Sequence, residues 1–444
     1  MVKSGNKYPE ILFISLLVFA MSASSFDSYA QSESGFGVKS DSTESNYTNQ
    51  DALGGPKAIG AQLKADNQKK ESYFRVPIRV TKGWYAWKAR LKENTGLQIG
   101  INYTSVYMSS SEVIDSEVNN PNTGSGILDI QLGWTLVNRK KGKNTGTLFA
   151  KMNNRHAYGN LTNSMFHGIF ESGYYGLPAT GFNNYSSRLL ELNWQQNFFD
   201  SRLQFVLGKV DMTNYFNFHG LVVPWTSFLG YGSSLSGTIN WPNQGVGIVG
   251  SFRFNDNWYF MGALADAYGD DFAQNNFLDF GDQFFEGKFF KAAEVGWVPS
   301  MAERYFKKIS LTYWSTDAYT RGGNDIASSN GIAFTSHWFF KEKFAPYVRF
   351  AFSEGNGENA FYKKDVQIGH GFVFKSHDLL GTSFSWAETN IPDSENQMTV
   401  EVYYRFHLTE HLAITPDFQW IINPTLNPNV NSLTYLGVRG RVTF

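Results

Sequence analysis

The sequence of 444 residues contains no cysteine, so disulfides, thiolate metal sites and cysteine nucleophiles are excluded. Charged residues make up 17% of the chain, against roughly 25% in an average soluble domain. The formal net charge of −1 argues against the basic surface that nucleic-acid binding requires. No stretch approaches 18 consecutive apolar residues, so we expect no transmembrane helix.

Aromatic residues and glycine are abundant instead. The chain has 39 Phe, 23 Tyr, 12 Trp and 42 Gly, yet its mean hydropathy is −0.32. So many aromatic residues argue against disorder. A chain that is aromatic, rich in glycine and poor in charge is typical of an all-β protein, including one that faces lipid.

The N-terminus has the three parts of a secretory signal peptide. Lys3 and Lys7 precede an apolar stretch at 11–21, and Ser28-Tyr29-Ala30 follows. We predict cleavage after Ala30, because the apolar stretch is too short to span about 30 Å of hydrocarbon. The domain prediction is therefore a signal peptide at 1–30, a flexible polar leader at 31–79 and one barrel domain at 80–444.

From residue 97 onward, apolar and polar residues alternate. In the first segment Leu97, Ile99 and Ile101 alternate with polar or small residues, as in a strand with one apolar face. About sixteen such segments follow one another, each of roughly 8–11 residues, the length of a tilted strand that crosses a bilayer. They start near residues 97, 127, 147, 189, 203, 245, 258, 290, 308, 331, 345, 365, 379, 397, 412 and 434.

The connections between these segments alternate between long and short. Long ones include 157–187 and 210–244, while Asp200-Ser201 and Thr409-Glu410-His411 are short. Outer-membrane barrels have short periplasmic turns and long extracellular loops. The pattern predicts a transmembrane antiparallel β-barrel of about sixteen strands.

The charged residues follow the same alternation. Where its phase is clear, the polar face carries Asp129, Glu191, Arg253, Arg349, Glu401, Arg405, Asp417, Arg439 and Arg441, which we expect to line the lumen. The apolar face carries none of these types, although His370 lies on it. The phase is ambiguous in four segments, near residues 147, 258, 290 and 331. Aromatic residues near segment ends predict interfacial girdles, among them Trp134, Trp338 and Phe339.

The C-terminal segments resemble a known family. The runs Val400-Glu-Val-Tyr-Tyr-Arg-Phe-His-Leu-Thr409 and Ile414-Thr-Pro-Asp-Phe-Gln-Trp-Ile-Ile-Asn-Pro424 are similar to the end of the carbohydrate-selective porins (OprB). The segment 207–211 also resembles a strand end of this family, and the segment 83–91 is a looser match to its pre-barrel stretch. The terminal Phe444 is similar to the signal that the outer-membrane assembly machinery reads. The resemblance implies a sixteen-stranded barrel that passes sugars by passive diffusion, with charged and aromatic residues at a constriction.

The connection 210–244 is dense in aromatic residues, including Tyr215, Phe218 and Trp225. One interpretation is a loop that folds into the barrel and offers its rings to sugars. The other is packing against further loops or a neighbouring protomer. The lumen arginines likewise either bind sugar hydroxyls or form ion pairs that keep the pore rigid.

Motifs for other functions are weak. Gly245-Val-Gly-Ile-Val-Gly250 lacks the following helix that a dinucleotide site needs, and neither G-x-S-x-G nor H-E-x-x-H occurs. Acidic residues such as Asp266 and Asp270-Asp271 are more often solvated than metal-binding. We therefore predict no enzyme, no catalytic residue, no metal and no cofactor.

The sequence thus predicts an outer-membrane porin for carbohydrates, with sugars and outer-membrane lipid as its partners, in a Gram-negative cell. The alternatives are a general diffusion porin on the same barrel, an outer-membrane barrel hydrolase, and a barrel that does not conduct. Porins commonly form trimers, so a homo-oligomer is among the expected states.

Overall fold

The computed structural model describes residues 53–68, 70, 72–74, 82–271, 281–374 and 378–444. The predicted signal peptide at 1–30 lies outside these ranges, as do parts of the predicted leader. All of the described residues belong to one compact unit, which begins at Tyr47.

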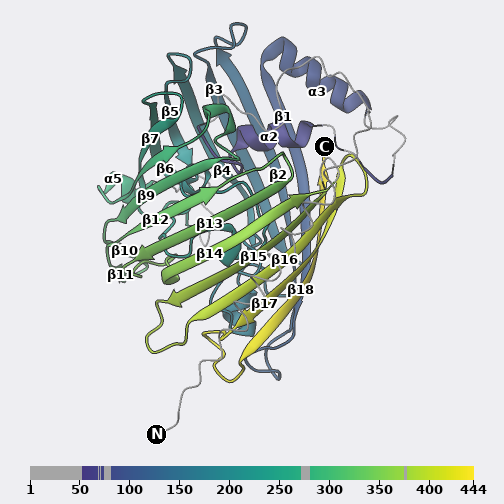
Figure 1. The fold of residues 1–444 in the computed structure, drawn as a ribbon, viewed down its shortest axis with the longest axis vertical. Coiled ribbons are helices and arrows are strands. Elements are labelled where there is room, and N and C mark those ends of the chain that lie inside the picture. Colours follow the sequence, from purple (N-terminus) through teal and green to yellow (C-terminus); the bar gives the residue numbers. More distant parts are fainter. Residues whose placement is uncertain (1–52, 69, 71, 75–81, 272–280, 375–377) are drawn as a thin grey trace. The chain divides into compact units, whose positions relative to one another are not determined.

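Sixteen antiparallel strands form a closed barrel, in which β1 pairs with β18 as well as with β2 (Figure 1). The first eight barrel strands are β1 (Leu97–Ser110), β2 (Asn122–Val137), β3 (Gly146–Ala157), β4 (Tyr185–Phe198), β5 (Leu203–Val210), β6 (Gly245–Arg253), β7 (Trp258–Asp266) and β8 (Phe289–Trp297). The others are β9 (Lys308–Thr316), β12 (Ser329–His337), β13 (Phe344–Ser353), β14 (Tyr362–Val373), β15 (Leu379–Thr389), β16 (Gln397–His407), β17 (Leu412–Ile422) and β18 (Ser432–Thr443). A small hairpin, β10 (Tyr319–Arg321) and β11 (Asn324–Ile326), lies in the connection after β9.

Short helices occupy the connections and the segment before the barrel. They are α2 (Ile59–Asn67), α3 (Lys82–Thr95), α4 (Tyr231–Ser234), α5 (Asp282–Phe285), the π-helical turn η1 (Gly168–Ser172) and the 3-10 turns η2 (Met212–Asn214) and η3 (Met301–Glu303). None of the helices in the described ranges is long and apolar enough to cross a membrane.

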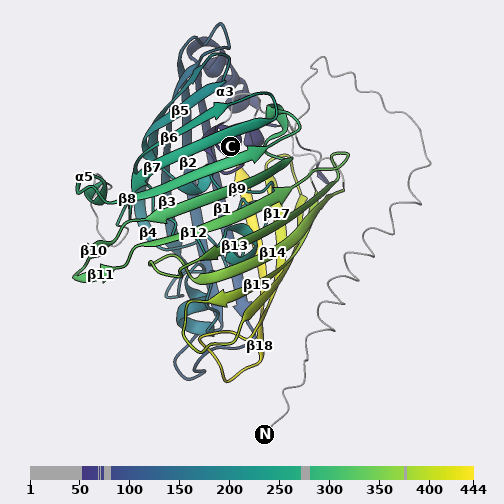
Figure 2. The ribbon, with the colours of Figure 1, turned by 60° about the vertical axis from the view of Figure 1, so that its left-hand side comes forward.

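The fold class predicted from the alternation is confirmed, and each predicted segment corresponds to one barrel strand. Several strands are longer than predicted, with 14 residues in β1 and 16 in β2. The additional residues lie next to the long loop 111–121, where small polar residues such as Ser109 and Asn122 interrupt the apolar alternation but still pair in the ladder. Figure 2 shows the tilt of the strands.

The two faces of the wall differ as predicted. In β9 the side chains alternate strictly, with Leu311 49% exposed on the outer face and Thr312 buried on the lumen face. In two of the four ambiguous segments, β3 and β8, the faces are now assigned: Lys151 and Glu294 point into the lumen, whereas Lys291 lies on the outer face and pairs with Asp317 at 2.6 Å.

Of two further predictions for the outer face, the one for His370 is confirmed and the one for Phe339 is wrong. His370 lies on this face and forms a hydrogen bond with the Thr382 hydroxyl (3.0 Å). The assignment of Phe339 to a girdle is wrong, because it is buried beside Phe306, one residue out of phase with its exposed neighbour Phe340.

Part of the predicted flexible leader is folded, which corrects that expectation for residues 53–68. Leu53, Ile59 and Leu63 are buried, and α2 contacts β1, β2 and β3 on the lumen side (Figure 1). The segment is polar on average and so looks like a flexible leader, but its three apolar residues are buried against the barrel wall.

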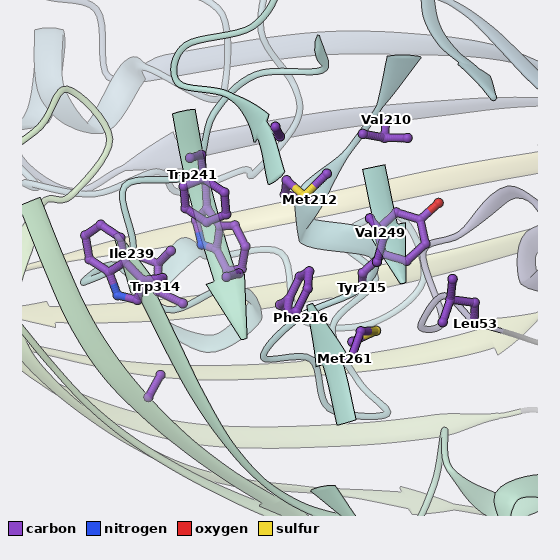
Figure 3. Packing of buried hydrophobic residues seen from close by; sticks show 14 of the residues in the cluster. Leu53, Val210, Met212, Tyr215, Phe216, Ile239, Trp241, Val249, Met261 and Trp314 are labelled. Atoms are coloured by element: carbon purple, nitrogen blue, oxygen red, sulfur yellow. The ribbon is translucent and has the colours of Figure 1, made fainter. Parts of the chain in front are cut away.

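Long loops also fill part of the lumen. Loop residues Met212, Phe216 and Trp241 pack against wall residues such as Val249 and Trp314 (Figure 3). The connections 158–184 and 211–244 are largely buried. The aromatic loop therefore folds into the barrel, and it also packs against the connection 158–184, where the Tyr231 N–H donates to the Leu177 carbonyl (2.8 Å).

Lipid-facing positions can be tested along a single strand. We expect Leu311→Arg, near the middle of β9, to destabilise the barrel by about 2–4 kcal/mol, because a cation then faces hydrocarbon. Ile309→Arg, near the turn end of β9, should cost about 0–1 kcal/mol. Urea unfolding in phospholipid vesicles measures both, and equal losses would contradict the assigned depths.

Candidate pore constriction

Carboxylates of the barrel wall hold the loop 211–244 inside the lumen. Glu401 accepts hydrogen bonds from the backbone N–H groups of Leu229 (2.5 Å) and Gly230 (3.1 Å). Asp365 likewise accepts from the Gly237 N–H (3.1 Å) and the Ser236 hydroxyl (2.9 Å). Each carboxylate satisfies buried donors of a loop that has no ladder of its own.

Guanidinium groups of the wall bind the carbonyl groups of the same loop. Arg349 donates to the Asn217 carbonyl (2.7 Å), and Arg405 donates to the Thr226 carbonyl (2.7 Å). Arg439 donates to the carbonyls of Ser227 (2.8 Å) and Pro224. Because these side chains are engaged by the loop, we interpret Arg349, Glu401, Arg405 and Arg439 as loop anchors.

Three further predicted lumen residues lie away from the loop contacts. Asp417 accepts from Gln419 (3.1 Å), whose amide also donates to Pro178 in the connection 158–184. Arg441 forms a two-fold hydrogen bond with Asp66 of α2 at 3.0 and 3.1 Å. Arg253 has the lumen parity but stands at the turn end of β6 and is half-buried.

Two cavities approach each other from opposite ends of the barrel. A cavity of about 740 Å³ lies on the short-turn side and is bordered by Gly142, Thr145 and the helices α2 and α3. A cavity of about 690 Å³ lies on the long-loop side and is bordered by Asn163, Asp271 and other loop residues. Glu191 lines both cavities, so we call the region around it the neck.

Charges of both signs surround the neck. Glu191 accepts from Asn214 of the loop (3.1 Å). The ammonium group of Lys151 lies 4.8 Å from the centroid of the Trp225 ring and 3.5 Å from Asp129. Arg155 lines the long-loop side of the neck. The neck therefore offers hydrogen-bond donors, acceptors and an aromatic face within one narrow region.

Two of the neck charges lie outside the strands. Lys57 donates to the Thr213 hydroxyl, which donates to Asp211 at 2.5 Å. Burial lowers the pKa of Lys57, while nearby Asp211 acts in the opposite direction. Burial would raise the pKa of Asp211, but Lys57 and the hydrogen bonds from Thr213 and Gln244 outweigh it and place that pKa below its ordinary value.

The predicted aromatic residues separate into two groups. Tyr215 borders the short-turn cavity and Trp225 the long-loop cavity, so both flank Glu191. Phe218 of the same loop is instead buried against the wall, where its ring centroid lies 3.7 Å from the Lys308 ammonium of β9.

Sequence reasoning missed four neck residues: Lys57, Lys151, Arg155 and Asp211. Lys151 and Arg155 belong to a segment of ambiguous phase, which the burial of Asn153 between them resolves. Lys57 follows Gly54-Gly55-Pro56 in the segment taken for a leader, and no periodicity marks it. Within the described ranges, no group of three or more His, Asp or Glu side chains is placed to hold a metal ion.

The anchoring role of Glu401 is testable. Glu401→Gln removes the negative charge to which two loop N–H groups donate. The free energy that holds the loop to the wall should fall by about 1–3 kcal/mol. We expect a folded barrel with a larger and noisier single-channel current. Glu388→Gln, which breaks only an exposed pair with Lys364, is the matched control and should leave the trace unchanged. Identical traces for the two variants would contradict the anchor.

Comparisons with known proteins agree with the barrel fold. The sequence model of the carbohydrate-selective porin, OprB family, matches residues 368–444. Among the curated proteins, none matches the chain in sequence. The structure of Pseudomonas putida OprB at high pH is similar with a TM-score of 0.65 and 14% identity, covering 81% of this chain and 97% of that one.

Two weaker likenesses also concern porins. The low-pH structure of P. putida OprB has a TM-score of 0.48 and 13% identity, covering 85% of this chain and 100% of that one. A mutant porin of Rhodopseudomonas blastica has a TM-score of 0.46 and 10% identity, covering 78% of this chain and 100% of that one. The family match over the C-terminal strands, together with the porin fold, confirms the resemblance of this chain to the carbohydrate-selective porins of the OprB family.

Proposed function

We propose that this protein is a porin of the Gram-negative outer membrane that lets small carbohydrates diffuse through its barrel. The observation that carries the proposal is the neck, where Glu191 borders both the cavity of the short-turn side and the cavity of the long-loop side. The match to a carbohydrate-selective porin family supports it independently. Export by the predicted signal peptide at 1–30 belongs to the same proposal.

The chemistry of the neck suits a neutral solute with many hydroxyl groups. A carboxylate such as Glu191 accepts hydrogen bonds from hydroxyl groups, and cationic groups such as Lys151 and Arg155 donate to their oxygens. The ring of Trp225 offers an apolar face for the C–H side of a sugar. A sugar without net charge can thus exchange its hydrogen bonds to water for hydrogen bonds at the neck.

The size of the cavities fits a small solute. Each has a volume within the range of about 300–1,000 Å³ that is typical of sites for small molecules. A narrow neck between two wider cavities admits a solute from either side. Direction is then set by the concentration gradient, which is the behaviour of a channel rather than an enzyme.

The sugar dependence of the current tests the proposal. In planar bilayers we expect glucose to reduce the single-channel ion current, because bound sugar displaces ions and water from the neck. Liposome swelling should be faster with glucose than with a neutral solute of similar size. Equal swelling rates and an unblocked current would instead indicate a general diffusion porin, and absence of conductance would exclude a channel.

Glu191 provides a second test of the same site. Glu191→Gln removes a charged acceptor, and we expect the apparent affinity for glucose in the current-block assay to fall about tenfold, which corresponds to about 1.4 kcal/mol. Asp200→Asn, which breaks an exposed pair with Lys143 at a short turn, is the control and should leave the affinity unchanged. An unchanged affinity in Glu191→Gln would remove this residue from the sugar site.

A further inference from the structure

The segment Leu53–Gln68, which precedes the barrel in sequence, lies inside the lumen. Its contacts with the pore interior come from different parts of the segment. Arg304 of the connection after β8 donates to the Leu53 carbonyl. Trp225 of the inserted loop donates to Gln62 (2.8 Å), and Arg441 of the last strand binds Asp66. The segment is therefore bound on three sides rather than merely enclosed.

The segment reaches the neck through a tight passage at its start. The Gly55 N–H donates to the carbonyl of Asn214 (2.5 Å), the residue whose side-chain amide donates to Glu191. A Cβ atom at Gly55 would lie 2.6 Å from the buried ring of Phe218. Only glycine fits this close approach, and it places Lys57 two residues later at the neck.

The chain leaves the lumen at the short-turn end. After α2, the N–H groups of Tyr73 and Phe74 donate to the carbonyls of His407 (3.1 Å) and Leu408 (2.8 Å), at the turn between β16 and β17. The segment 53–68 thus occupies the lumen on the side of the short turns. Residues Gly54, Ala58 and Leu63 line the cavity of that side, while Lys57 lines the opposite one.

We propose that Leu53–Gln68 is a built-in constriction of the pore and that Lys57 is a selectivity-determining residue that this segment supplies. This proposal rests on the proposed channel function. Lys57 lines the long-loop cavity together with the cations Lys151 and Arg155 and the carboxylates Glu191 and Asp211. Its charge favours solutes that carry a carboxylate, such as sugar acids, and small anions over cations. Without this segment, the barrel wall alone would form a wider pore that is less permeable to anions.

Ion selectivity tests the role of Lys57 without any sugar. In a KCl gradient around 0.1 M, Lys57→Gln should raise the permeability ratio of cation to anion by about two- to tenfold, because one unit charge at roughly 4–8 Å acts on both ions with opposite sign and is partly screened by the salt. Lys64→Gln removes the same charge from the same segment, at the wide short-turn cavity, and should change the ratio far less. An unchanged ratio in Lys57→Gln, or equal shifts in both variants, would overturn the assignment.

Thiol labelling tests the position of Lys57 directly, because the chain has no cysteine of its own. In Lys57→Cys, a small anionic methanethiosulfonate should reduce the single-channel current in one step, and glucose should slow the reaction. In Lys64→Cys the reagent should leave most of the current. Absence of a step at Lys57→Cys, while the channel conducts, would show that residue 57 is not in the pore.

Displacement of the segment tests the constriction itself. Gly55→Val should push the segment away from Phe218, and deletion of 53–68 should remove it. Both variants should conduct more current per channel than the unmodified protein. Equal or smaller conductance in folded variants would overturn the constriction, yet glucose block of the unmodified protein would still support the sugar channel. Failure of the channel proposal gives a different pattern, since the unmodified protein would then not conduct or not respond to sugar.

Discussion

The closing of the hydrogen-bonded ladder between β1 and β18 is the constraint on which the rest of the structure depends. In hydrocarbon a strand with unpaired N–H and C=O groups is too costly, so the sheet must return to its own first strand. Closure of sixteen strands leaves a lumen too wide for wall side chains to fill. The wall side chains that face this lumen are mostly polar, because the alternation directs most apolar side chains of the strands outward.

A polar lumen in turn needs partners for its charges, and the inserted loop provides them. Wall carboxylates bind backbone N–H groups, and wall guanidinium groups bind backbone carbonyls of the same loop. Since the partners are backbone groups, the loop sequence can vary without loss of its anchors. The aromatic residues of the loop are then free to shape the neck, as Tyr215 and Trp225 do from its two sides.

The barrel could be predicted from the sequence because its signal is local. A period of two, repeated sixteen times, identifies each strand, and in twelve of the strands also the lumen face, without knowledge of long-range contacts. The neck could not be predicted in the same way. Lys57, Lys151 and Asp211 come from a segment before the barrel, a strand of ambiguous phase and an irregular loop. Only the folded chain brings them together, although parity alone placed Glu191 correctly in the lumen.

The paired hydrogen bonds between Asp66 and Arg441 join the start of the described chain to its final strand. The segment that narrows the lumen therefore obtains one of its attachments only when β18 has taken its place in the wall. A barrel that still lacked its last strand would be open at the seam and also wider inside. The order in which the strands enter the membrane thus decides when the channel reaches its final internal width.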